Sequence, residues 1–349
     1  MKIVKTSKYV DSFRNQSVIG QYDLDFVNNE IKEEWNVDLQ LPTQWKLGVI
    51  VGNSGTGKTT LAKEIFNYVD VIKEKLGNES ILDLFEKTTS LKEITHILTL
   101  VGFASPKSWL KPYKVLSNGE KMRVDLALAL LSAKKMIVFD EFTSVVDRNV
   151  AITMCQVINK ILPKIDKQLL LISCHEDVLY YLDTDWIYDT NVMELTLEKK
   201  KRQTRQLYIY QAERSFWRMF SKFHYLDSSL LKTAACYVAI LDNIIVGFCA
   251  VIHFPHPSSK MMKRIHRIVV LPDYQGIGIG KLLLNTVCQK YKIEKFKMFL
   301  TTSNFAMVKA LYNSQNWILK RKGHMIPSTT TMIGMAQSKN KYTYSFTYV

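Results

Sequence analysis

A glycine-rich turn followed by a lysine and two threonines is the first stretch whose residue types and spacing could do chemistry. Gly52 and Gly57 bracket the turn, and Lys58 follows it directly. Glycines allow backbone angles that other residues resist, so the N–H groups of such a turn can point at phosphate oxygens. A helix that starts at Lys58 would add its positive dipole end, and Thr59 would ligate Mg²⁺. The predicted phosphate-binding residues are Gly52, Asn53, Ser54, Gly55, Thr56, Gly57, Lys58, Thr59 and Thr60.

Two apolar runs further along the chain end in titratable side chains. Asp140 and Glu141 come directly after Met136–Phe139, and His175 ends the stretch that begins with Leu169–Ser173. Such runs are typical of buried parallel strands, and ligands bind at the carboxyl ends of these strands. We expect Asp140 to hold Mg²⁺ and Glu141 to act as the general base that polarises the attacking water.

A polar turn precedes an amphipathic stretch between these two sites. The turn is Ser117-Asn118-Gly119, and Glu120 stands three residues after Ser117. A serine with a glutamate three residues later is the pattern of a helix capping box. The N–H groups at the start of such a helix could also hold a phosphate, so the two interpretations are compatible.

In chain order, these stretches resemble the motifs of ABC-type ATPases. The residues that carry the resemblance are Lys58 (Walker A), Ser117, Asn118 and Gly119 (signature), Asp140 and Glu141 (Walker B), Asp147 (D-loop) and His175 (switch histidine). The resemblance implies a P-loop α/β domain over residues 1–198 that binds ATP with Mg²⁺. It also implies that His175 contacts the γ-phosphate.

The same resemblance implies a homodimer, because the chain carries one full set of motifs. In this family the signature residues Ser117, Asn118 and Gly119, with Asp147, close over the nucleotide of the other copy. The signature departs from the usual pattern at Asn118 and Glu120. No glutamine lies between Lys58 and Ser117, so the loop that contacts transmembrane partners lacks its usual residue. This favours a soluble ATPase over a transporter subunit.

A second strand–turn–helix pattern lies in the C-terminal half. The strand-like stretch Ile265–Leu271 leads into Pro272, and the glycine-rich turn Gln275–Gly280 follows. A dinucleotide fingerprint would need a glycine where Lys281 stands, so that interpretation fails. The turn's amides and the helix dipole could instead cradle a pyrophosphate.

This turn resembles motif A of the GCN5-related N-acetyltransferases (GNAT). The resemblance implies a mixed α/β acyltransferase domain over residues 207–349, after a basic linker at 199–206, with acetyl-CoA or another acyl-CoA as cofactor. The cofactor-binding residues that it implies are Val269, Val270, Leu271, Gln275, Gly276, Ile277, Gly278, Ile279, Gly280 and Lys281. Tyr312 lies in a segment similar to the one that supplies the family's general acid. The alternative is that Tyr312 is an ordinary, half-buried helix tyrosine. His266 is the nearest ionisable candidate for a base, and a structural role is equally open.

Several elements must position these residues. Helices are predicted over Leu61–Tyr68, Ile81–Gly102 and Phe305–Tyr312, and an aromatic, basic helix over Phe216–Leu226. Asp242-Asn243 between two apolar runs predicts a hairpin of Ala235–Leu241 with Ile244–His253. Short strands with a loop through Asn28–Trp35 are expected at the N-terminus. An aromatic there could stack on adenine, and the choice among Tyr9, Phe13 and Tyr22 stays open.

Composition bounds the function. The chain has 349 residues, enough for two domains, with no long apolar run and five cysteines without a CxxC pair. These features predict a reduced, cytoplasmic protein without a membrane span. Residues 201–349 hold 22 Lys and Arg against 5 Asp and Glu. Such a basic half is a candidate for binding DNA or RNA, although a basic surface or an anionic-cofactor pocket would also account for it.

The sequence thus predicts a soluble ABC-type ATPase fused to a CoA-dependent N-acyltransferase that modifies a nucleic-acid base. Phe223-His224-Tyr225-Leu226 resembles the Mom-like branch of the acetyltransferases, which modifies adenine in phage DNA. One alternative is acetylation of a protein or a small amine. Another is an ATP-switched nucleic-acid clamp with a degenerate GNAT domain.

Overall fold

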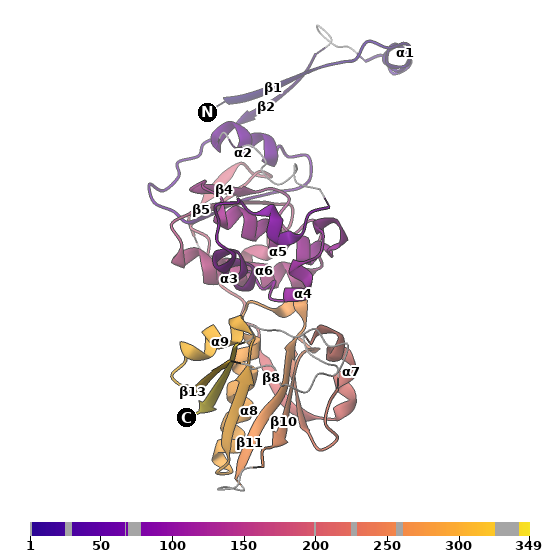
Figure 1. The fold of residues 1–349 in the computed structure, drawn as a ribbon. Helices are drawn as coiled ribbons and strands as arrows, with labels where there is room; N and C mark the ends of the chain where they lie inside the picture. Colours follow the sequence, from indigo (N-terminus) through magenta and orange to yellow (C-terminus); the bar gives the residue numbers. More distant parts are fainter. Residues whose placement is uncertain are drawn as a thin grey trace. The chain divides into compact units, whose positions relative to one another are not determined.

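The computed structural model describes residues 2–24, 30–66, 68, 78–198, 200–224, 229–255, 261–324 and 342–349 (Figure 1). The chain divides into two compact units. The first comprises residues 1–71, 135–144 and 166–201, and the second comprises residues 72–134, 145–165 and 202–349. Two stretches that precede the basic linker thus belong to the same unit as the C-terminal half.

The first unit is built on a five-stranded sheet with the order β4-β5-β3-β6-β7. Its strands are β3 (Leu47–Val51), β4 (Met136–Phe139), β5 (Gln168–Ser173), β6 (Trp186–Asp189) and β7 (Glu194–Thr196). All neighbours are parallel except β6 and β7. Every residue of the central strand β3 is buried, as expected of an apolar run in a parallel sheet. The predicted strands before the glycine turn, the carboxylate pair and His175 are confirmed.

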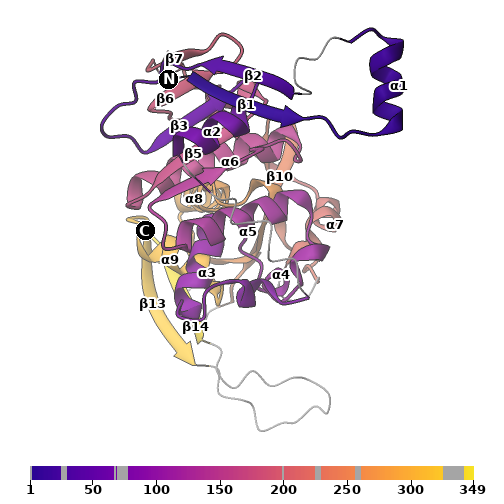
Figure 2. The same ribbon diagram turned by 90° about the horizontal axis from the view of Figure 1, so that it is seen from above.

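An antiparallel pair, β1 (Lys2–Lys8) and β2 (Glu30–Asn36), adds to the first unit. The predicted loop through residue 35 is wrong from Glu30 onward, because opposite charges favour pairing of these strands: Lys5 lies across from Glu33. Residues 28 and 29 lie outside the described part. Between the strands, α1 (Phe13–Gln21) contains no buried residue, and Figure 2 shows it standing away from the five-stranded sheet.

The second unit begins with helices and shorter helical turns. They are η2 (Ile81–Leu84), α3 (Leu91–Leu100), α4 (Pro106–Trp109), η3 (Tyr113–Val115), α5 (Asn118–Leu131), α6 (Arg148–Ile161) and η4 (Leu162–Lys164). The prediction of one helix over residues 81–102 is wrong. Ser90 and Glu93 form a capping box that starts α3 afresh, so the chain makes a short turn at η2 before it.

A seven-stranded sheet with the order β13-β14-β12-β11-β10-β9-β8 completes the second unit. Its strands are β8 (Leu207–Ala212), β9 (Ala235–Leu241), β10 (Ile244–His253), β11 (Met262–Val270), β12 (Lys297–Thr302), β13 (Trp317–His324) and β14 (Tyr342–Tyr348). The predicted β9–β10 hairpin is confirmed, with Asp242 and Asn243 both at positive φ. Only β11 and β12 are parallel neighbours.

Helices cover both faces of this sheet, as the alternation of side chains along β9 shows. Tyr237 and Ala239 share a core with α8 (Ile279–Ile293), whereas Cys236 and Val238 share one with α7 (Trp217–Phe220). The helix predicted over 216–226 is wrong in length: α7 is four residues long and is flanked by the turns η6 (Arg214–Phe216) and η7 (Ser221–Phe223). Residues 225 and 226 lie outside the described part.

Strands β11 and β12 diverge after a short parallel pairing. The strands pair only from Met262 with Lys297 to Ile265 with Leu300. Beyond this point β11 continues to Val270 and pairs with β10 alone. One edge of its last residues is therefore open to a ligand.

Within the described ranges, no helix has both the length and the apolar character that a membrane span requires.

Candidate active sites

The predicted phosphate turn joins β3 to α2 (Lys58–Phe66) in the first unit. The Nζ of Lys58 lies over the turn and donates to the carbonyls of Gly52 at 2.8 Å and Asn53 at 2.6 Å. The hydroxyls of Thr56 and Thr190 are 2.6 Å apart and fix the far side of the turn. The turn is therefore formed in advance, with its lysine poised at the point where phosphates would enter.

Trp35 is an aromatic at this site that the sequence did not single out. Gly57 has φ +84°, and a Cβ placed on it would come 2.7 Å from Cε2 of the Trp35 indole. Gly57 is therefore needed both for its conformation and for the close approach of the ring. Of the aromatics considered for adenine stacking, Phe13 is 88% exposed on α1 and Tyr22 ends that helix. Trp35 lies in a run of charged residues, and the sequence gave no sign that it would lie beside Gly57.

Asp140 and Thr59 come together, as predicted. The Oγ1 of Thr59 donates to Oδ1 of Asp140 at 3.3 Å, and the Tyr68 hydroxyl donates to Oδ2 at 3.1 Å. The backbone N–H of Glu141 also donates to Oδ1, at 2.8 Å. A hydroxyl and a carboxylate oxygen are hard ligands of the kind that Mg²⁺ takes beside phosphate oxygens and waters. These residues therefore fit the ion.

Glu141 and His175 follow neighbouring strands of the sheet. Glu141 is exposed and has φ +53°, a conformation that ordinary side chains seldom adopt and that is often found at functional sites. The ring Nδ1 of His175 lies 3.1 Å from the hydroxyl of Thr143. Phe142 lies between Glu141 and Thr143 in the chain, and its N–H donates to the carbonyl of Ile172 in β5, at 2.8 Å. The segment after β4 is thus held rigidly beside His175.

The signature turn and the D-loop residue lie in the second unit, each at the start of a helix. Ser117 caps α5 and forms a capping box with Glu120, which confirms that prediction. Asp147 caps α6 by accepting from the N–H groups of Asn149 at 2.9 Å and Val150 at 3.1 Å. Asn118 donates from its side-chain amide to the carbonyl of Val145, at 3.0 Å. This hydrogen bond connects the start of α5 to the segment just before α6.

The second predicted turn runs from β11 through η8 (Pro272–Tyr274) to α8. Gln275 pins it, because its side-chain amide donates to the carbonyl of Val270 at 2.9 Å. Gly278 caps α8 at φ +104°, where an added Cβ would meet nothing within 4 Å. Its backbone angle, rather than lack of space, therefore requires glycine, and the surface over the helix start stays open.

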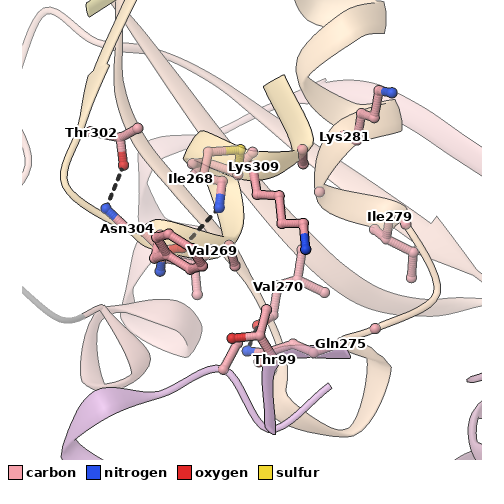
Figure 3. A pocket seen from close by; sticks show the side chains of 18 of the residues that line it. Thr99, Ile268, Val269, Val270, Gln275, Ile279, Lys281, Thr302, Asn304 and Lys309 are labelled. Carbon is pink, nitrogen blue, oxygen red and sulfur yellow. Dashed lines mark hydrogen bonds between the residues drawn. The ribbon is translucent and has the colours of Figure 1, made fainter. Parts of the chain in front are cut away.

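A cavity of about 740 Å³ lies over this turn, entirely within the second unit (Figure 3). Of the predicted residues, it is lined by Val269, Val270, Gln275, Gly276, Gly278, Ile279, Gly280, Lys281 and His266. Leu271 and Ile277 belong to the turn but are not in the lining. The cavity is thus bounded by the predicted cofactor turn and by the strands that separate.

The two catalytic candidates of this domain have different surroundings. His266 is the extra residue of a β-bulge, since Ala250 pairs with Arg267 and Val251 with Ile265. Bulges re-aim side chains and are common beside active sites. Tyr312 ends α9 (Phe305–Tyr312), is 70% exposed and is not in the cavity lining. The structure thus brings His266, but not Tyr312, into the described cavity.

Two further histidines, His96 and His224, line the cavity and were not assigned to it from the sequence. The Nζ of Lys309 lies 2.9 Å from Nε2 of His96. Burial, and then the charge of Lys309, lowers the pKa of His96, which favours its neutral form. No Asp or Glu is among the described lining residues. Among the described lining residues, the histidines are therefore candidates for a base near neutral pH.

Arg123 joins the signature helix to the cofactor turn. It is 2% exposed, and its guanidinium donates to the carbonyls of Val101 at 2.8 Å, Asp273 at 2.8 Å and Gln275 at 3.3 Å. Burial lowers the pKa of Arg123 to about 10, partly offset by the charges of Asp273 and Glu120. The sequence showed an arginine in this helix but gave no sign of partners so distant along the chain.

Comparisons with known proteins match the two halves separately. The family model described as "Acetyltransferase (GNAT) domain" matches residues 232–318. The energy-coupling factor transporter ATP-binding protein EcfA1 of Leuconostoc mesenteroides is 26% identical over 184 residues, covering 42% of this chain and 66% of that protein. The methionine import ATP-binding protein MetN 3 of Pectobacterium atrosepticum is 28% identical over 185 residues, covering 41% and 53%. The chain therefore spans less than two thirds of either relative.

Among solved structures, the IAA acetyltransferase from Bacillus cereus is 17% identical and matches with a TM-score of 0.32 over 41% of this chain and 99% of that one. With the motifs and topology described above, the sequence matches establish the coarse organisation of the molecule. The chain carries a GNAT acetyltransferase domain, preceded by an ABC ATPase-like region.

Proposed function

We propose that the protein is an ATP-hydrolysing ABC-type ATPase fused to an acyl-CoA-dependent N-acyltransferase, with the domain boundaries at 198 and 207. The cavity of about 740 Å³ carries the acyltransferase half of this proposal. It combines an open strand edge, which can bind an extended chain, with a glycine turn at a helix start, which can bind phosphates. Acyl-CoA has both parts: an extended thioester arm and a pyrophosphate.

ATP occupies the first unit in this proposal. Lys58 binds the β- and γ-phosphates, Thr59 and Asp140 hold Mg²⁺, and Glu141 polarises the attacking water. His175, held beside Thr143, contacts the γ-phosphate. The ion supplies charge neutralisation for the phosphates. The signature residues complete the site of a second copy, so the active form is a homodimer.

Acyl transfer takes place in the cavity. The acceptor nitrogen attacks the thioester carbonyl carbon, so a C–N bond forms as the C–S bond breaks. His266 accepts the proton that leaves the nitrogen, since an imidazole suits proton abstraction near neutral pH. The departing CoA thiolate takes up a proton. Tyr312 remains a proposal for that donor, although its side chain is exposed outside the cavity lining.

The acceptor we propose is the amine of a nucleic-acid base. The described lining holds Arg264, Arg267 and Lys309 but no Asp or Glu. Such a site attracts a polyanion and disfavours a cationic amine. A base must be unstacked to enter the cavity, so single strands are the expected substrate.

The function is tested by following thiol release from acetyl-CoA, with single-stranded DNA, single-stranded RNA or a lysine peptide as acceptor. We expect release with a nucleic acid, and an acetylated nucleoside in the mass spectrum of its digest. Release with the peptide alone would move the acceptor to protein. No release with any acceptor, together with ATP-dependent nucleic-acid binding, would instead support a clamp with an inactive acetyltransferase fold.

Nucleic-acid binding should depend steeply on salt. Each phosphate contact releases counterions, so log K should fall against log[salt] with a slope of about −0.7 to −0.9 per contact. Four to six contacts would then lower affinity by roughly 10²-fold between about 50 and 200 mM salt. Anisotropy of labelled single- and double-stranded oligonucleotides measures this slope. A flat, weak response for both would contradict nucleic-acid binding.

A further inference from the structure

Three lysines meet beside the cofactor turn, and two of them come from the helical segment that precedes the GNAT domain. Lys160 near the end of α6 and Lys164 in η4 line the same cavity as Lys281 in the first turn of α8. Partial burial, and then the charges of Lys164 and Lys281, lowers the pKa of Lys160. The charges of Lys164 and Lys281 therefore act on the ammonium of Lys160.

Lys160 is attached to the turn itself. Its Nζ donates to the carbonyl of Gly276 at 2.5 Å. The helix also lies directly against the turn, because a Cβ on Gly276 would come 2.9 Å from Cγ2 of Val157. A lysine ammonium has three N–H donors, so two remain for a ligand after this bond. The ammonium is therefore held beside the place where a phosphate would lie.

This arrangement needs an anion to be electrostatically complete. The described lining contains no Asp or Glu, so the repulsion among the lysines is not offset within the cavity. Backbone N–H groups of a glycine turn provide hydrogen bonds but only partial charge. Acyl-CoA carries a pyrophosphate and a 3′-phosphate, whose negative charge exceeds what the turn alone can neutralise.

We propose that Lys160 and Lys164 bind the phosphate groups of acyl-CoA, so that the helical segment before the GNAT domain supplies part of the cofactor site. This inference rests on the proposed acyl-CoA-dependent function and names residues outside the turn that binds the cofactor. Lys281 in the first turn of α8 lines the same cavity (Figure 3) and is the third lysine of this group. The helix that Asp147 caps, α6, therefore ends at the proposed acyl-CoA site.

The test uses the full chain and calorimetry with three probes: acetyl-CoA, its 3′-dephospho form and S-acetylpantetheine, which lacks every phosphate of the nucleotide. The variant Lys160→Gln/Lys164→Gln should bind acetyl-CoA about 10–100-fold more weakly than the native protein, because two charge-assisted contacts are lost. Its affinity for S-acetylpantetheine should be unchanged. With the dephospho form, a persisting difference assigns the lysines to the pyrophosphate, and a vanished one assigns them to the 3′-phosphate.

Matched variants separate charge from folding. Lys292→Gln/Lys297→Gln removes two exposed charges of the same unit outside the lining, and should bind as the native protein does. Lys164→Gln leaves the bond from Lys160 to Gly276 in place and should still weaken binding, whereas Lys160→Arg/Lys164→Arg should retain it. Equal acetyl-CoA affinity of the double Gln variant and the native protein overturns this inference alone. No acetyl-CoA binding by the native protein overturns the proposed function instead.

Discussion

Replacing Glu141 with glutamine is expected to slow ATP hydrolysis by about 10²–10⁴-fold, the usual contribution of a general base. Glutamine has nearly the same shape but cannot take a proton from water. Lys58, Thr59 and Asp140 stay in place, so ATP still binds. In the proposed homodimer the signature of one copy closes over the nucleotide of the other, so the variant should accumulate as an ATP-bound dimer. Size-exclusion chromatography with ATP and Mg²⁺ measures this state beside the hydrolysis rate.

A second variant, at Ser117, tests the paired-site mechanism and must leave helix α5 intact. An aspartate is as good a helix cap as serine, so Ser117→Asp keeps the start of α5 while opposing a γ-phosphate with negative charge. Glu141→Gln combined with Ser117→Asp should therefore stay monomeric in ATP. A Glu141→Gln protein that remains monomeric by itself would contradict the paired-site mechanism.

Gly278→Asp should reduce acetyl-CoA affinity by about 10²–10³-fold. The carboxylate would stand at the start of α8, where the pyrophosphate is expected. Two unit charges about 4 Å apart repel by roughly 4 kcal/mol at the effective dielectric of a protein surface, and competing water lowers the net effect. Calorimetry on the full chain measures the change.

Gly278→Ala is the matched control for this charge. It forces the same positive φ on a non-glycine residue, and an added Cβ meets nothing within 4 Å. Both variants place a non-glycine residue at this φ, and thermal unfolding measures the loss of folding stability that each one incurs. Equal acetyl-CoA affinity in the alanine and aspartate variants would show that phosphate does not approach this helix start.

Local patterns were predicted well from the sequence because their causes lie within a few residues. The β9–β10 hairpin depends on Asp242 and Asn243, which accept the positive φ that such a turn requires. Helix α9 was predicted over the same residues as observed, Phe305–Tyr312. The phosphate turn was found because its glycines and Lys58 stand at fixed spacing.

Other features could not be predicted, because their partners lie far along the chain. Arg123 and the carbonyl of Asp273 are 150 residues apart, and no periodicity connects them. His266 was a candidate from its residue type, but its place in a β-bulge follows from the register of β10 against β11. The pairing of β2 with β1 places Trp35 beside Gly57, but the sequence had predicted a loop over this segment. These positions depend on strand register and on contacts between residues far apart in the chain, and neither can be inferred from local sequence patterns.

The hydrogen bonds of Arg123 decide which fragments of this protein can keep the glycine turn in place and which parts can be exchanged. A fragment that begins at residue 206 would retain the glycine turn Gln275–Gly280 but lose the guanidinium that ties down the carbonyls of Asp273 and Gln275. It would also lose the bond from Lys160 to Gly276. A chimera that exchanges the acetyltransferase half must therefore graft residues 72–134 and 145–165 along with it. The compact unit that holds the glycine turn therefore takes in residues on both sides of the basic linker.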